Sequence, residues 1–181
     1  MSDVLKGKRI AILATDGVER RELDEPRTAV HHAGGTTELL SLHTGTIDAR
    51  NHDLEPAGEF EVDRKVADAD VGEFDGLLIP GGTVNADKLR SDESAVAFVH
   101  DFVDSGKTVG VICHAPWTLV EAGVADGMTL TSYPSLRTDL KNAGAIIVDE
   151  EVVVDRNVIS SRSPDDLPAF CRAVVGRFAS V

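Results

Sequence analysis

The sequence predicts one α/β domain in which a mostly parallel β-sheet carries helices on both faces. Short apolar runs, which suit strands buried on both sides, alternate with helical segments of about 10 to 15 residues. The 181 residues fit a single domain that can bury its own core without disulfides or a structural metal. We therefore expect residues 1–181 to form one unit without a linker or an internal repeat.

The first half of the chain predicts three buried strands, two helices and one polar excursion. The strands are expected at 8–14, 36–42 and 76–79, and the last of them ends in the turn "PGG". The helices are expected at 22–33 and 92–105, and each ends at glycine. Residues 44–70 are polar with short alternating pieces such as "EFEVDRKV", which favours an antiparallel hairpin at the edge of the sheet.

The second half continues the alternation of strands and helices. Further strands are expected at "TVGVI", "MTLTSY", "AIIV", "EVVVD" and "VISS", and helices at 115–121 and 135–144. The last helix is predicted after Ser163 as its cap and Pro164 as its first residue, because apolar residues then recur at helical spacing up to Phe178.

Three loops are expected to meet at one site. They are "TDGVERRE" after the first strand, "PGGTVNADKLR" after "GLLI", and "CHAP" after "TVGVI". Ligands of parallel α/β sheets bind beyond the carboxyl ends of the strands. These loops therefore predict the place of a functional site.

Cys113 is the candidate nucleophile, because it stands where a buried strand gives way to a helix. Such a sharp turn exposes a side chain, and the positive end of the helix favours a thiolate. Spacing alone leaves an inert buried thiol equally open. The adjacent His114 can serve as general acid and base or can be a packing residue. Cys171, inside the last helix, is interpreted as structural.

Composition limits the classes of binding partner and the cellular compartment that we expect. A net charge of -13 opposes binding to nucleic acid and to anionic membranes. Two cysteines and the absence of a signal-peptide pattern predict a cytoplasmic protein with reduced thiols. No metal-ligand spacing and no phosphate-loop or dinucleotide motif occurs, so no metal and no cofactor are expected.

Five stretches together resemble the PfpI-type intracellular proteases of the ThiJ/PfpI superfamily. They are "ILATDGVERRELDEP", "FDGLLIPGGTVNADKLR", "VGVICHAPWTLVEAG", "LTSYPSLRTDLKNAGA" and "EVVVDRNVISSRSPDDLPAF". The resemblance covers nearly the whole chain and implies a flavodoxin-like three-layer sandwich with a nucleophile elbow. It implies that Cys113 is the nucleophile, with His114 beside it and Glu22 as the acid close to the sulfur. A protonated Glu22 would donate a hydrogen bond to the sulfur.

The resemblance also implies a homo-oligomer, a dimer or a hexamer, with the site at a subunit interface. Asp87 matches the position whose carboxylate orients the histidine of the neighbouring subunit, and a surface helix cap is the alternative. The sequence departs from the family pattern beside the nucleophile, where Ala115 replaces the usual glycine and Trp117 a common polar residue.

Other residues of the site follow from the turns and from the pocket. The backbone N–H groups of Gly82 and His114 are the expected oxyanion donors, because the Pro-Gly-Gly turn lets the chain approach the sulfur. Tyr133 and Trp117 are expected to line the pocket.

Two classes of function remain open on the sequence, beside a purely structural interaction module. The first is a cysteine-dependent enzyme that acts on a small carbonyl or a peptide, as a glyoxalase, a deglycase or a peptidase. The second is a redox sensor or stress-protective protein without turnover, in which Cys113 is oxidised and Glu22 stabilises the oxidised form. The enzyme is preferred, with small-carbonyl chemistry favoured over peptide hydrolysis.

Overall fold

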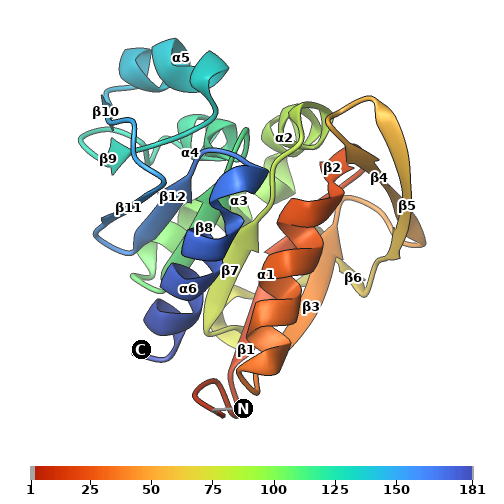
Figure 1. The fold of residues 1–181 in the computed structure, drawn as a ribbon. Helices are drawn as coiled ribbons and strands as arrows, with labels where there is room; N and C mark the ends of the chain where they lie inside the picture. The colour runs from red at the N-terminus through yellow and green to blue at the C-terminus, as the bar shows by residue number, and fades with distance from the viewer. Residues whose placement is uncertain (1–2, 181) are drawn as a thin grey trace.

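Seven strands form the central sheet of the computed structural model, which describes residues 3–180 (Figure 1). Neighbouring strands are parallel, except that the outermost strand at one edge is antiparallel to its neighbour. This confirms the predicted mostly parallel sheet. In spatial order the strands are β11 (Val152–Asp155), β12 (Val158–Ser161), β8 (Thr108–Ile112), β7 (Gly76–Ile79), β1 (Arg9–Leu13), β3 (Thr36–Ser41) and β6 (Arg64–Lys65).

Helices cover both faces of this sheet, which gives the expected three layers. On one face α1 (Arg20–His32) packs beside α6 (Leu167–Phe178) (Figure 1). On the other face lie α2 (Thr83–Arg90), α3 (Glu93–Asp104) and α4 (Pro116–Glu121), which contact one another.

The central strands are mostly apolar because each one supplies both cores. In β1, Ile10 and Ile12 face the core under α1 and α6, whereas Ala11 and Leu13 face the core under α2, α3 and α4. All four side chains are at most 1% exposed. Strand side chains alternate between faces, so burial on both faces produces the continuous apolar run that predicted this strand.

The segment after β7 is a helix and not only a loop, which corrects the prediction. Gly82, with a φ of 93°, precedes α2, and the buried Asn85 amide donates to the carbonyl oxygens of Pro80 and Gly81 at 2.9 Å each. Only three residues of α2 are buried, so "TVNADKLR" carries no strong helical periodicity.

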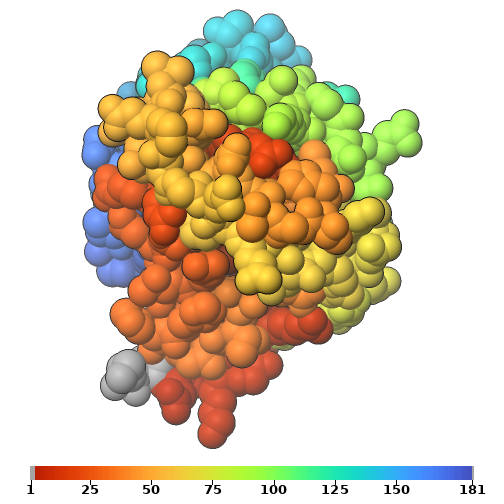
Figure 2. Space-filling view, turned by 90° about the vertical axis from the view of Figure 1, so that its right-hand side faces the viewer, coloured from red at the N-terminus to blue at the C-terminus, as the bar shows by residue number. Residues whose placement is uncertain are grey.

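The predicted hairpin exists, but it does not extend the edge of the central sheet. Strands β4 (Thr46–Asn51) and β5 (Glu55–Glu61) are antiparallel and form a separate sheet with the short β2 (Val18–Glu19). The edge of the central sheet is β6 instead. In Figure 2 the hairpin, coloured orange to yellow, lies next to the yellow-green residues of α2. The tip of the hairpin therefore reaches the end of the sheet at which the site is expected.

Residues 129–147, after α4, form a small outlying layer. Strands β9 (Thr129–Leu130) and β10 (Ile146–Ile147) pair with each other, on either side of α5 (Arg137–Asn142). Ser163 makes no side-chain cap, because a 3-10 turn at Pro164–Asp166 precedes α6. Further 3-10 turns occupy Val66–Asp68, Val71–Glu73 and Pro134–Leu136. No helix within residues 3–180 has the length and apolar character needed to cross a membrane.

Candidate active site

Cys113 occupies a strained turn between β8 and α4. Its φ is 63°, a left-handed conformation that is uncommon for a residue with a side chain. Two backbone hydrogen bonds hold the turn, from Cys113 N–H to the Ser161 carbonyl at 3.1 Å and from Tyr133 N–H to the Cys113 carbonyl at 3.0 Å. The side chain is 7% exposed and lines a pocket. This is the strand-turn-helix arrangement of a nucleophile elbow.

Glu22 reaches the same turn from the first turn of α1. Its Oε2 accepts the Gly81 N–H at 2.7 Å, and the side chain is 2% exposed. Its Oε1 is buried and has no hydrogen-bond partner among the described residues. The carboxyl as a whole lies close enough to Cys113 for its charge to act on the thiol.

Burial dominates the electrostatics of this acid and thiol. It raises the pKa of Glu22 to about 8, assisted by the charge of Glu19 and opposed by the Gly81 N–H. Burial is also the largest cause of the raised pKa of the Cys113 thiol. The negative charge of Glu22 is the second cause, and it raises this pKa as well. Both groups therefore hold their own protons at neutral pH. A protonated Glu22 carries no charge that repels a thiolate, and its carboxyl can donate a hydrogen bond to the sulfur.

Two backbone N–H groups oppose the effect of burial on the pKa of the Cys113 thiol. Hydrogen bonds from Gly82 and His114 lower the pKa of the Cys113 thiol, because they favour the thiolate. A Cβ at Gly82 would collide with the carbonyl oxygen of Gly17, so only glycine fits this approach. These are the two groups expected to stabilise an oxyanion. Helix α4 has only six residues, so its dipole favours the thiolate less than the dipole of a longer helix would.

His114 lies beside the thiol and is fixed by aromatic rings. Its Nδ1 is 3.1 Å from Cys113 Sγ. Tyr133, which lines the pocket, stacks on the imidazole at 4.7 Å between ring centroids. Trp117 does not line the pocket; it packs against the imidazole at 5.5 Å, and its Nε1 donates to Asp139 at 2.9 Å. Burial lowers the pKa of His114, and the charge of Asp53 opposes this shift.

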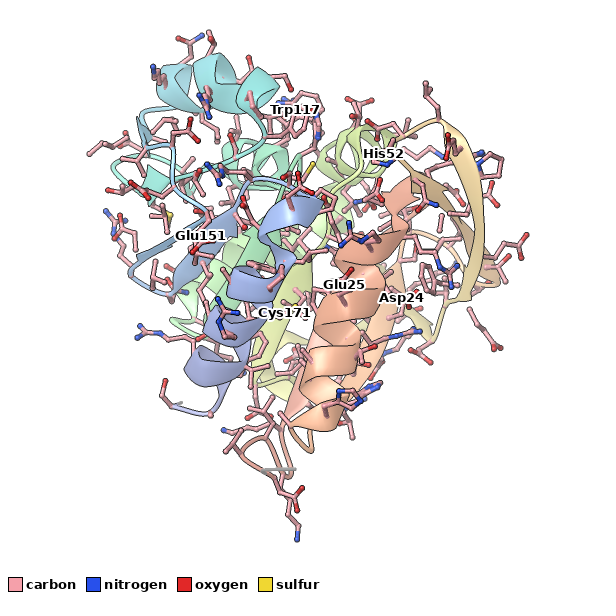
Figure 3. All side chains as sticks on the ribbon, viewed as in Figure 1. Asp24, Glu25, His52, Trp117, Glu151 and Cys171 are labelled. Atoms are coloured by element: carbon pink, nitrogen blue, oxygen red, sulfur yellow. The ribbon has the colours of Figure 1, made fainter. Side chains whose placement is uncertain are left out.

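The tip of the β4–β5 hairpin brings two residues that sequence reasoning missed, His52 and Asp53. Both have positive φ, 52° and 65°. Asp53 accepts both the N–H and the hydroxyl of Thr83 at 2.7 Å, and the Thr83 hydroxyl lies 3.3 Å from Nε2 of His114. Figure 3 shows His52 and Trp117 at the same end of the molecule. The polar "NHD" could have indicated a turn. Its position over the site depends on how the hairpin docks.

Two further carboxylates, Glu19 and Asp87, lie in different places relative to the pocket. Glu19, which is not among the site residues predicted from the sequence, is buried in the pocket wall, where its Oε2 accepts the His52 N–H at 2.8 Å and burial raises its pKa. Asp87 is exposed on α2 and does not line the pocket of its own chain. The role implied for Asp87 therefore requires a second copy of the chain.

The pocket is small and is lined by several titratable side chains. It encloses about 140 Å³. Carboxyl groups, two histidines and the thiol meet there at the carboxyl ends of the parallel strands. The lining residues are Glu19, Glu22, His52, Asp53, Gly82, Cys113, His114, Tyr133 and Pro164. Among the described residues, no group of three or more His, Cys, Asp or Glu side chains is placed to hold a metal ion.

A helix-covered parallel sheet with a cysteine at a strand-to-helix elbow defines the structural class of this protein. The profile of the DJ-1/PfpI family matches residues 8–177, and the chain therefore belongs to the DJ-1/PfpI family.

Two relatives and one solved structure illustrate this membership. General stress protein 18 of Bacillus subtilis is 40% identical over 168 residues, which are 92% of this chain and 95% of that protein. Protein/nucleic acid deglycase 2 of Escherichia coli is 40% identical over 167 residues, 91% and 94% of the two chains. A two-domain protein of Anabaena variabilis, with DJ-1/ThiJ/PfpI-like and ferritin-like domains, matches with a TM-score of 0.88 and 33% identity. That match covers 94% of this chain and 48% of the longer one.

Proposed function

We propose that this protein is a cytoplasmic stress-protection enzyme that uses the Cys113 thiolate on small dicarbonyl compounds and their adducts. The observation that carries the proposal is the surrounding of Sγ. It has the imidazole Nδ1 of His114 at 3.1 Å, the carboxyl of Glu22, and the N–H groups of Gly82 and His114. A nucleophile, a base, an acid and oxyanion donors are thus present at one atom.

The first chemical step joins the sulfur to the aldehyde carbon. His114 Nδ1 takes the thiol proton, and the sulfur lone pair forms the S–C bond while the carbonyl π pair moves to oxygen. The N–H groups of Gly82 and His114 stabilise that oxyanion until the imidazolium returns the proton. The product is a hemithioacetal on Cys113, and no oxidant or reductant is needed.

The second part of the reaction is an isomerisation followed by hydrolysis. With methylglyoxal, the imidazole removes the C1 proton to give an enediol and delivers a proton to C2, which leaves a thioester. Water then cleaves the thioester to lactate and restores the thiol. The sum is methylglyoxal plus water to lactate. With the hemiaminal of an amine and the dicarbonyl, the sulfur displaces the amine at C1: the S–C bond forms, the C–N bond breaks, and the imidazolium gives the former thiol proton to the leaving amine.

Pocket size supports a small carbonyl over a peptide. A volume of about 140 Å³ suits a three-carbon substrate, whereas drug-sized ligands occupy pockets of about 300 to 1,000 Å³. The names of the relatives, a general stress protein and a protein/nucleic acid deglycase, support stress protection and dicarbonyl chemistry.

The proposal includes a homo-oligomer, a dimer or a hexamer, in which Asp87 of a neighbouring subunit approaches His114. Its exposure on α2, the helix that begins at the oxyanion glycine, makes it available for such a contact. A second carboxylate near the imidazole would stabilise the imidazolium of the first step.

One observation favours oxidation of Cys113 as an alternative. The unpartnered Oε1 of Glu22 can donate a proton to an oxygen atom on the sulfur, which would stabilise a sulfinate. Nucleophilic turnover and oxidation would compete for the same thiol, so the same experiments separate them.

The test is multiple-turnover consumption of methylglyoxal in an amine-free buffer, with lactate measured as product. Casein-derived peptides serve as the competing substrate. We expect lactate in excess over protein and no new peptide termini. Peptide cleavage without lactate would overturn the dicarbonyl assignment, and neither activity, together with selective peroxide oxidation of Cys113, would establish the redox alternative.

A further inference from the structure

We propose that Asp53, acting through Thr83, fixes the protonation of His114 within one chain, so that Nε2 carries the ring proton and Nδ1 faces Cys113 as the base. The kinetic part of this inference rests on the function proposed above, whereas the position of the ring proton does not. Asp53 would therefore be a positioning residue that acts on His114 through Thr83.

The first link is the pair of hydrogen bonds between Thr83 and Asp53. The Thr83 N–H occupies Oδ1 at 2.7 Å, and the Thr83 hydroxyl lies 2.7 Å from Oδ2. A carboxylate only accepts hydrogen bonds, whereas a hydroxyl has one proton to donate. The Thr83 hydroxyl therefore donates its proton to Asp53 and has only lone pairs to offer elsewhere.

The second link is the contact between that hydroxyl oxygen and the imidazole. Thr83 Oγ1 is 3.3 Å from Nε2 of His114. Because the oxygen can only accept here, Nε2 must carry a proton. A neutral imidazole has one N–H, so its Nδ1, 3.1 Å from the sulfur, holds a free lone pair. Nδ1 is then able to take the thiol proton.

A second hydroxyl near Nε2 does not decide the tautomer. Ser135 Oγ lies 3.4 Å from Nε2 and can rotate to donate or to accept. The Thr83 proton is committed by Asp53, and the Ser135 proton is not. Asp53 is thus the group that selects one of the two tautomers.

The hairpin tip that carries Asp53 is held from two sides. Glu19 accepts the His52 N–H at 2.8 Å on one side, and Thr83 holds the carboxylate of Asp53 on the other. Two consecutive residues with side chains at positive φ are costly unless the surroundings hold them. The hydrogen bonds explain why this conformation persists. The relay, by which we mean the contacts from Asp53 through Thr83 to His114, explains what the conformation does for the site.

The direct test is the substitution Asp53→Asn, which should reverse the direction of the hydrogen bonds between residue 53, Thr83 and His114. The asparagine Oδ1 can still accept the Thr83 N–H, so its Nδ2 is placed against Thr83 Oγ1 and must donate. The Thr83 hydroxyl then turns its proton toward Nε2, and the ring proton moves to Nδ1. Removing an acceptor charge while preserving shape thereby inverts the tautomer.

We would record nitrogen NMR signals of the His114 ring in a Cys113→Ala background, where no thiol competes for Nδ1. We expect Nε2–H as the main tautomer when Asp53 is present and Nδ1–H as the main tautomer in the variant Asp53→Asn. Asp48→Asn, an identical change on the exposed part of the same hairpin, is the matched control and should keep Nε2–H. An unchanged tautomer in folded Asp53→Asn, or Nδ1–H before the substitution, would overturn the inference.

Variants of Thr83 keep the inference testable if Asp53→Asn fails to fold. Thr83→Ser keeps the hydroxyl and should keep Nε2–H, whereas Thr83→Val removes it and should give a mixture of tautomers. Where the native enzyme turns over, Thr83→Val and Asp53→Asn should each lower kcat by about tenfold or more, with rescue by Thr83→Ser. Absence of native turnover would contradict the proposed function alone, because the NMR signals test the relay separately.

Discussion

Glu22 and Cys113 both lie against the α-carbon of Gly81. A methyl group there would stand 2.6 Å from Glu22 Oε2 and 2.7 Å from Cβ of Cys113. The Gly81 N–H also binds Oε2 at 2.7 Å. A glycine of the Pro-Gly-Gly turn thus sets the acid beside the thiol, although the two residues come from opposite halves of the chain.

Glu22 should make the stability of the protein depend on pH. Its pKa is raised from 4.5 to about 8 on folding, so between these values the folded state holds a proton that the unfolded state has lost. Stability from this group is complete below pH 4.5 and falls as the pH rises toward 8. Urea unfolding at pH 5 and at pH 8 should show that the native protein loses unfolding free energy between these two values. The loss in Glu22→Gln should be smaller than that in the native protein by at least about 1.4 kcal/mol. Glu25→Gln, on the same helix, controls for the lost charge. Equal pH dependence of native protein and Glu22→Gln would contradict the raised pKa.

Gly82→Ala should reduce both stability and turnover. Gly82 and Gly45 share a φ of 93°, but a Cβ at Gly82 would collide with Gly17, whereas nothing lies within 4 Å of one at Gly45. Gly45→Ala should cost about 1 kcal/mol of unfolding free energy, from the left-handed backbone alone. Gly82→Ala should cost more and displace the oxyanion N–H, lowering kcat by about 10²-fold. Similar stabilities and rates for the two variants would show that the close approach at Gly82 is unimportant.

Asp87 should act in trans if the proposed oligomer is correct. Cys113→Ala keeps Asp87, and Asp87→Ala keeps Cys113, so mixed oligomers contain sites with both groups. Each variant alone should have low turnover, and mixing them with subunit exchange should restore about a quarter of the native rate in a dimer. No gain after demonstrated exchange would remove Asp87 from the mechanism.

The sheet and three of the loops around the site could be predicted because local patterns encode them. Residues 10–14 are apolar on both faces of a strand, and the segments that carry Glu22, Gly82 and Cys113 follow parallel strands. Parallel pairing then places those loops together without further information.

The contribution of the hairpin could not be predicted in the same way. Asp53 reaches His114 only through Thr83, and this contact depends on a separate small sheet docking beside α2. Helix α2 itself buries only Asn85, Ala86 and Leu89, which is too little for a clear periodic signal. Trp117 was expected in the pocket from its nearness in sequence to Cys113, but its ring turns to Asp139. Tertiary docking decides each of these positions.

The most direct test of Cys113 as the nucleophile compares the two cysteines of the chain. Cys171, on α6 beside Glu25 of α1 (Figure 3), lies outside the active-site pocket, and burial raises the pKa of its thiol to about 11. We would measure methylglyoxal turnover in amine-free buffer for the native protein, Cys113→Ala and Cys171→Ala, with circular dichroism as the check on folding. The account predicts turnover by native protein and Cys171→Ala, and none above background by Cys113→Ala. Equal turnover by Cys113→Ala would contradict it.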